Sequence, residues 1–211
     1  MFKRINVAFV MLLAAVGLIA AACGGDDGGD KPTIIFSDLN WDSALQQNAI
    51  ARRIVEDGYG YETDVVSGDT ISLFQGLQNG DTHVSLEIWL PNQQEAWDKA
   101  IKAGSVVPLG KSLADNWQSM FIIPKYVQEA NPGLKSWSDI EAHKDLFVTA
   151  DSKGKAALIS CIPGWECEKV NAAKWEGYGL QDVVEIINPG SGAAREASIR
   201  GEFEKQDAWL G

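Results

Sequence analysis

Residues 33–56 read TIIFSDLNWDSALQQNAIARRIVE, a short apolar strand followed at once by an amphipathic helix. The run from Thr33 to Ser37 predicts a buried strand, and Asp42 or Ser43 would cap the helix that follows. The helix is expected to continue to about Glu56. Its spacing places five apolar side chains on the inner side: Leu45, Ala49, Ile50, Ile54 and Val55.

The same order of strand and helix continues along the chain. Further strands are expected at residues 62–66 and 84–88, and further helices at 70–79 and 92–103. Strand–helix–strand units with this spacing predict a parallel sheet covered by helices. The sequence therefore predicts an α/β fold.

A break in this pattern at residues 108–119 divides the chain into two expected α/β lobes, 32–112 and 113–211. In the second lobe we expect strands at 120–123, 146–149 and 183–187 and helices at 166–178 and from Gly192. Ligands of open α/β sheets bind beyond the carboxyl ends of the strands. Trp41 and Trp89 each follow an expected strand and Trp165 lies in a loop of the second lobe, which would let all three line one cleft.

The N-terminal residues have the pattern of a bacterial export signal. Lys3 and Arg4 precede an uncharged apolar run, and small residues precede Cys23, as in a lipobox whose cysteine receives lipid. A membrane span is the other interpretation, but a run of about 16 residues is shorter than a span usually requires. We therefore expect a signal peptide over 1–22, and over 23–31 a lipidated Cys23 with a flexible linker.

The composition narrows the classes of partner and site. The chain has 29 acidic and 18 basic residues and a net charge of −11, which argues against nucleic acid binding and against electrostatic adhesion to anionic lipid. With Cys23 lipidated, Cys161 and Cys167 remain as a pair in an oxidising compartment, where a disulfide is expected. Two cysteines without a nearby set of histidines or carboxylates at ligand spacing are a poor zinc pattern, so no metal site or cofactor is expected.

Residues 161–167, CIPGWEC, hold Trp165 inside the cysteine pair, just before a helix that is expected to start at Glu166. The face of an aromatic ring attracts a cation, and free amides at a helix N-terminus attract an anion. The loop therefore offers both halves of a site for a zwitterion. A disulfide-stapled turn with its tryptophan in the core is the alternative interpretation.

Five segments carry a resemblance to a known family: Ile34–Asp38 with Trp41–Asp42, Glu87–Pro91, Ile122–Tyr126, Cys161–Cys167 and Gly190–Ala194. Together they resemble the substrate-binding lipoproteins of glycine betaine/choline ABC transporters, over Lys31 to Gly211. The resemblance implies a two-lobed type II periplasmic-binding-protein fold and no enzymatic activity. Members of this family normally continue further, so it also implies a C-terminal truncation before the return to the first lobe.

The resemblance also implies a cage of aromatic rings around a quaternary ammonium. Trp89 and Trp165 match cage positions, and Trp41 matches the aromatic residue of the choline-binding branch. The cage would lie between the two lobes.

Four further residues complete the expected site. The backbone amides of Glu166 and Cys167 would hold a ligand carboxylate. Gln93 stands where some members of the family have a histidine, and it remains a hydrogen-bond donor. Trp117 lies at the expected boundary between the lobes, where it would either close one side of the cleft or have a purely structural role.

The implied function is capture of glycine betaine or a related quaternary amine (choline, proline betaine or carnitine) for osmoprotectant uptake. An ABC permease and, through it, its ATPase would be the partners, and lipid would hold the protein on the outer face of the cytoplasmic membrane. Alternatives are a receptor for a different small solute, an adhesion or sensor lipoprotein, and an exported lipid-anchored hydrolase. The hydrolase is disfavoured because His83 and His143 have no recognisable nucleophile or carboxylate partner.

Overall fold

Two separate pairs of parallel strands, each with its own helices, make up the computed structural model, which describes residues 31–113 and 119–211. The expected signal peptide, the lipidation site Cys23 and the candidate Trp117 lie outside the described residues. Within them, every helix is too short or too polar to cross a membrane.

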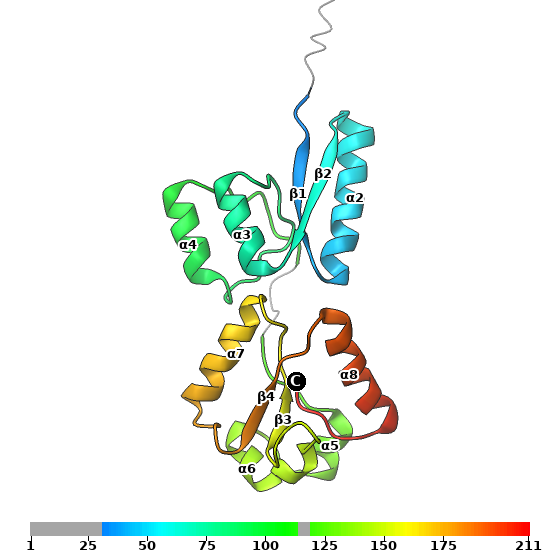
Figure 1. The fold of residues 1–211 in the computed structure, drawn as a ribbon, viewed down its shortest axis with the longest axis vertical. Helices are drawn as coiled ribbons and strands as arrows, with labels where there is room; N and C mark the ends of the chain where they lie inside the picture. Colours follow the sequence, from blue (N-terminus) through cyan, green and yellow to red (C-terminus); the bar gives the residue numbers. More distant parts are fainter. Residues whose placement is uncertain (1–30, 114–118) are drawn as a thin grey trace, which may run out of the picture. The chain divides into compact units, whose positions relative to one another are not determined.

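The first pair joins β1 (Ile34–Leu39) to β2 (Thr63–Gly68), with Ile34 opposite Thr63. Parallel strands need a crossover connection, and α2 (Asp42–Tyr59) supplies it. α3 (Thr70–Asn79) follows β2, and both helices contact β1 (Figure 1). α4 (Gln94–Ala103) comes later in the chain. The crossover helix α2 therefore returns the chain to the start of β2. The loop between β1 and α2 lies at the carboxyl end of the strand pair.

The second pair joins β3 (Ala156–Ile159) to β4 (Val184–Ile187) through α7 (Glu166–Gly177), and α8 (Gly192–Lys205) follows β4. α8 contacts β3. Short helices precede this pair: α5 (Lys125–Ala130), η1 (Trp137–Asp139), α6 (Ile140–His143) and η2 (Lys144–Phe147). This part of the chain thus repeats the strand–helix–strand arrangement of the first pair.

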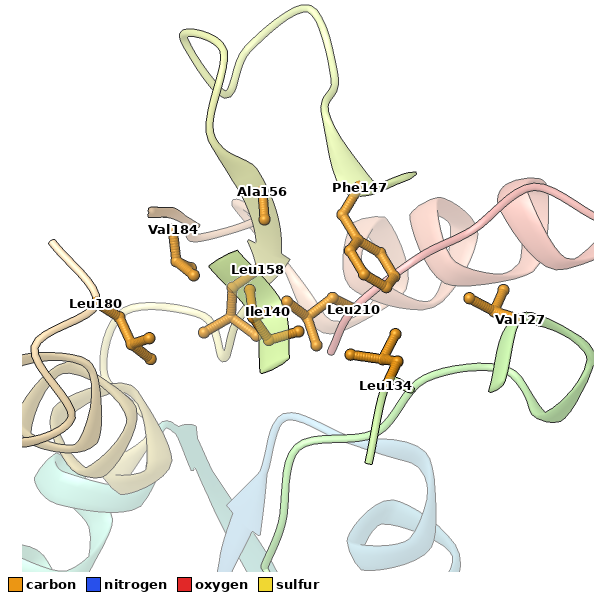
Figure 2. Close-up of a cluster of buried hydrophobic side chains, with 9 residues drawn as sticks. All are labelled: Val127, Leu134, Ile140, Phe147, Ala156, Leu158, Leu180, Val184 and Leu210. Carbon is orange, nitrogen blue, oxygen red and sulfur yellow. The ribbon is translucent and has the colours of Figure 1, made fainter. Parts of the chain in front are cut away.

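The largest apolar core surrounds β3 and β4. Leu158 and Val184 are completely buried, and Figure 2 shows their side chains among those of the short helices and the C-terminal residues. Nine buried residues form this cluster: Val127, Leu134, Ile140, Phe147, Ala156, Leu158, Leu180, Val184 and Leu210. A smaller cluster of Leu39, Ala44 and Leu73 lies at the end of β1, with Trp41 packed against it. Each strand pair therefore has its own apolar support.

The alternation of strands and helices is confirmed, but three expected strands are wrong. In 84–88 only Val84 bridges to β1, because the chain leaves β1 at this point. Residues 120–123 form no strand; Ile122 exchanges two backbone hydrogen bonds with Gly211 instead. Residues 146–149 form the end of η2 and the irregular chain that follows it. The strand of this region is β3, whose alanine-rich sequence gave no strand signal.

The prediction of which face of α2 is buried is also wrong. Leu45, Ile50 and Ile54 are 42, 63 and 56 % exposed, whereas Ala44 and Asn48 are buried. The cause is a polar contact: Asn48 Nδ2 donates to the Ser37 carbonyl and to Asp38 Oδ1, each at 2.9 Å. These bonds turn the Ala44–Asn48 side of the helix toward β1.

Replacing Leu158 by Ala should lower the free energy of unfolding by about 3 kcal/mol, because it leaves a cavity in a completely buried position. Urea denaturation followed by circular dichroism measures the change. Leu109→Ala is the matched control, since Leu109 is 92 % exposed and its truncation should change stability by less than about 0.5 kcal/mol. Equal losses in the two variants would contradict the position of the core.

Candidate functional site

The loops at the carboxyl ends of β1 and β3 meet at two tryptophans. Trp41 directly precedes α2, and Trp165 directly precedes α7. Their ring centroids are 5.4 Å apart, with the ring planes at 81°. Trp165 Nε1 donates to Asn40 Oδ1 at 2.6 Å, which fixes the second ring beside the first. Two rings at right angles form a corner with aromatic walls.

Trp89 joins this group through a shared acceptor, the carboxylate of Glu87. Trp41 Nε1 and Trp89 Nε1 both donate to Glu87 Oε2, at 2.8 and 2.9 Å. Gln47 Nε2 donates to the other oxygen, Oε1, at 2.5 Å. Glu87 itself is only 4 % exposed. The three tryptophans expected from the sequence are therefore connected, two by Glu87 and two by direct ring contact.

Backbone pairing with β1 determines where Glu87 lies. His83 N donates to the Ile35 carbonyl at 2.7 Å, and Ser37 N donates to the Val84 carbonyl at 2.8 Å. Beyond Val84 the chain is irregular, and the Leu90–Pro91 peptide that follows Trp89 is cis. This short segment brings a carboxylate and an indole to the N-terminal half of α2.

The loop 161–167 is closed by a disulfide between Cys161 and Cys167, with an S–S distance of 2.07 Å. Gly164 has a φ of +97°, and a Cβ there would lie 2.6 Å from Cγ of Asp69. Asp69 is the N-cap of α3, where its side chain accepts from Ser72 N at 3.1 Å. Only a glycine can therefore bring the loop this close to the start of α3.

The first turn of α7 supplies the expected amides. An α-helix leaves the N–H groups of its first turn without intrahelical acceptors, and Glu166 and Cys167 are the first two residues of α7. The Glu166 side chain lies 3.7 Å from Lys169 Nζ, so its negative charge has a positive neighbour. An anionic group could accept hydrogen bonds from these amides, helped by the helix dipole.

Gln93 and the two histidines of the chain make contacts other than hydrogen bonds to the rings. Gln93 is buried at the N-cap of α4, and among the described residues no hydrogen bond links its side chain to the three tryptophans. Ile35 N donates to His83 Nδ1 at 3.1 Å, and His143 Nδ1 donates to the Asp139 carbonyl at 2.9 Å. Both histidines thus make contacts typical of structural residues.

Sequence reasoning missed the polar residues that hold the rings: Asn40, Gln47 and Glu87. Glu87 had a usable signal, because it lies two residues before Trp89 and extended chain places such a pair on the same side. Asn40 and Gln47 had none, since their partners are 125 and 40 residues away.

The arrangement offers groups that attract charged ligands. Among residues 31–113 and 119–211, no three histidine, cysteine or acidic side chains are grouped as a metal site would require. Aromatic faces beside helix amides attract a cation and an anion without reacting with either.

A comparison with protein families identifies a match over residues 32–211, to the substrate-binding domain of ABC-type glycine betaine transport systems. The trimethylamine N-oxide-binding protein of Pelagibacter ubique is 23 % identical over 203 residues, which cover 94 % of this chain and 63 % of that protein. The chain thus spans less than two thirds of the length of this relative.

Solved structures show the same fold. A glycine betaine/L-proline-binding protein from Borrelia burgdorferi has a TM-score of 0.67 and 21 % identity, covering 85 % of this chain and 62 % of that one. A choline-binding protein of an ABC transporter, in complex with choline, has a TM-score of 0.66 and 24 % identity, covering 85 and 60 %. The two-lobed type II periplasmic-binding-protein fold predicted from the sequence is confirmed by these matches.

Gly164→Ala should destabilise the loop and displace Trp165, because the new Cβ meets both an unfavourable φ and the Asp69 side chain. We expect a loss of about 2 kcal/mol or more in the free energy of unfolding, measured by urea denaturation with tryptophan fluorescence.

Gly154→Ala is the matched control. Gly154 has a φ of +79° and no atom near the position of a new Cβ, so it reports the backbone cost alone. A loss in Gly164→Ala no greater than in Gly154→Ala would show that the approach to Asp69 contributes nothing. Adding Asp69→Ser, which keeps a capping hydroxyl, should recover part of the difference.

Proposed function

We propose that this chain, which belongs to the family of substrate-binding domains of ABC-type glycine betaine transport systems, captures glycine betaine or a related quaternary amine. The observation that carries the proposal is that Trp41 contacts the Trp165 ring directly and shares the acceptor Glu87 with Trp89. The family binds solutes and is not a family of enzymes.

A trimethylammonium group explains why the site consists of rings. Such a group has no N–H to donate, so carbonyl or hydroxyl oxygens cannot satisfy it by hydrogen bonding, whereas ring faces attract it electrostatically. Each desolvated cation–π contact is worth about 2 kcal/mol, and three give about 6 kcal/mol. Micromolar binding needs about 8 kcal/mol, so other contacts must contribute the rest.

The amides of Glu166 and Cys167 would contribute that remainder for a ligand that carries a carboxylate. They follow Trp165 directly, so a cation beside this ring and an anion at the helix start suit a short zwitterion. Glycine betaine has this form; choline carries a hydroxyl in place of the carboxylate. Gln93 and Trp117 remain proposed contributors to the same site.

The proposed partners are those of an importer. Ligand bridging the loops after β1 and β3 would favour a closed form, which a membrane permease and its ATPase would recognise. Lipid on Cys23 would keep the protein at the outer face of the cytoplasmic membrane. Relatives named for trimethylamine N-oxide and for choline favour a methylated amine over an unrelated solute as the ligand.

Titration of tryptophan fluorescence tests the proposal. The full chain should respond saturably to glycine betaine or choline and not to glycine. The ammonium of glycine has N–H donors that would lose their hydrogen bonds to water at the rings, whereas a fully methylated nitrogen has no such donors. A response to glycine of equal strength, or no response to any methylated amine, would contradict the proposed ligand class.

Trp165→Ala should weaken the binding of choline or glycine betaine about 30-fold, through loss of one ring contact. Isothermal titration calorimetry measures the dissociation constant. Trp137→Phe is the control, because Trp137 packs edge-on against Phe121, 4.4 Å between ring centroids, on a part of the chain that supports β3 and β4. Unchanged affinity in Trp165→Ala would remove this ring from the site.

A further inference from the structure

Glu87 is the one acidic residue among the described residues whose carboxylate holds two of the candidate cage rings. It is 4 % exposed, and its three hydrogen-bond donors are the neutral side chains of Trp41, Trp89 and Gln47. Within the described residues no lysine, arginine or histidine forms an ion pair with it. Within the described residues, neutral donors alone therefore hold this carboxylate.

This placement affects the rings in two ways. The two indole N–H groups share one oxygen, so the orientation of both rings depends on the position of that atom. Donation to an anion is also stronger than donation to a neutral oxygen, and it polarises the donor group. An indole whose N–H points at a carboxylate therefore has a more negative ring face.

We propose that Glu87 is a positioning and specificity residue of the binding site: it sets the orientation of Trp41 and Trp89, and its charge makes the site selective for a cation over a neutral ligand of the same shape. This inference rests on the proposed function. Glu87 acts through the two rings, so it need not touch the ligand.

The burial of Glu87 is what gives its charge effect. An exposed carboxylate is screened by water and salt within about 8 Å at physiological ionic strength, whereas a buried one is screened much less. Glu87 accepts hydrogen bonds from both indole rings and is itself only 4 % exposed. Its charge would consequently act on a cation bound at the ring faces.

Glu87→Gln tests the charge while keeping a similar shape and one carbonyl oxygen for the indoles. Two probes separate charge from shape: choline and 3,3-dimethylbutan-1-ol, its neutral isostere in which carbon replaces nitrogen. We expect Glu87→Gln to weaken choline binding about tenfold and to leave binding of the neutral isostere within about twofold, by NMR titration of the full chain. Equal weakening of both probes, or unchanged choline binding, would overturn the role of the charge.

Glu87→Leu tests the orientation of the rings. It removes both acceptor oxygens, so the indole N–H signals of Trp41 and Trp89 should shift and lose protection from hydrogen exchange even without ligand. Binding of both probes should then fall. Unchanged indole signals would overturn the positioning role, and thermal unfolding followed by circular dichroism shows whether the variant still folds.

Asp57→Asn is the matched control for charge. Asp57 is an exposed acid near the far end of α2, about 24 Å from Trp41 along the helix axis, and it pairs with Arg53. Its replacement should leave choline binding unchanged. A tenfold loss in this variant too would attribute the effect to net charge and overturn the inference. If the unaltered chain binds no methylated amine, the proposed function fails and the cation selectivity fails with it; the indole signals still report the positioning role separately.

Discussion

Parallel pairing of strands is the constraint on which the rest of this structure depends. A parallel pair has to be joined by a crossover, so α2 and α7 each carry the chain back before the second strand begins. The loop that starts each crossover then lies at the carboxyl end of its first strand. Asn40 and Trp41 occupy that place after β1, and the disulfide loop with Trp165 occupies it after β3. The hydrogen bond from Trp165 to Asn40 therefore joins two loops that each follow the first strand of a parallel pair.

The parts of the fold that could be predicted from the sequence have local signals. α3 begins after the capping residue Asp69 and ends at Gly80, which has a positive φ, and α8 begins after the capping residue Ser191. β3 has no such signal: its short alanine-rich sequence is buried almost throughout, and its strand geometry comes from pairing with β4. The failure at 84–88 has the same origin, because only tertiary contacts decide that pairing stops at Val84.

The site divides in the same way. Large aromatic residues after strands could be identified as candidates, since Trp41, Trp89 and Trp165 stand in recognisable local patterns. Of the groups that orient them, only the pairing of Glu87 with Trp89 had a local signal, because Glu87 and Gln47 meet across 40 residues, and Glu87 and Trp41 across 46. Glutamate is also a residue type that is rarely buried, so composition argues against placing it in a core. Its burial is explained here only by the three donors that surround it.

A carboxylate behind the rings is better suited to selecting a methylated amine than a carboxylate facing the ligand. A carboxylate in the open cavity would accept hydrogen bonds from a primary ammonium and would favour that ligand over a trimethylated one. Trp41, Trp89 and Gln47 occupy the oxygens of Glu87, so its hydrogen-bonding capacity is largely used while its charge still acts at a distance. In the proposed site, the ligand would contact a polarised ring face, which attracts positive charge and offers no acceptor for N–H donors. We therefore propose that the same hydrogen bonds orient the rings and would give the site a preference for a methylated amine.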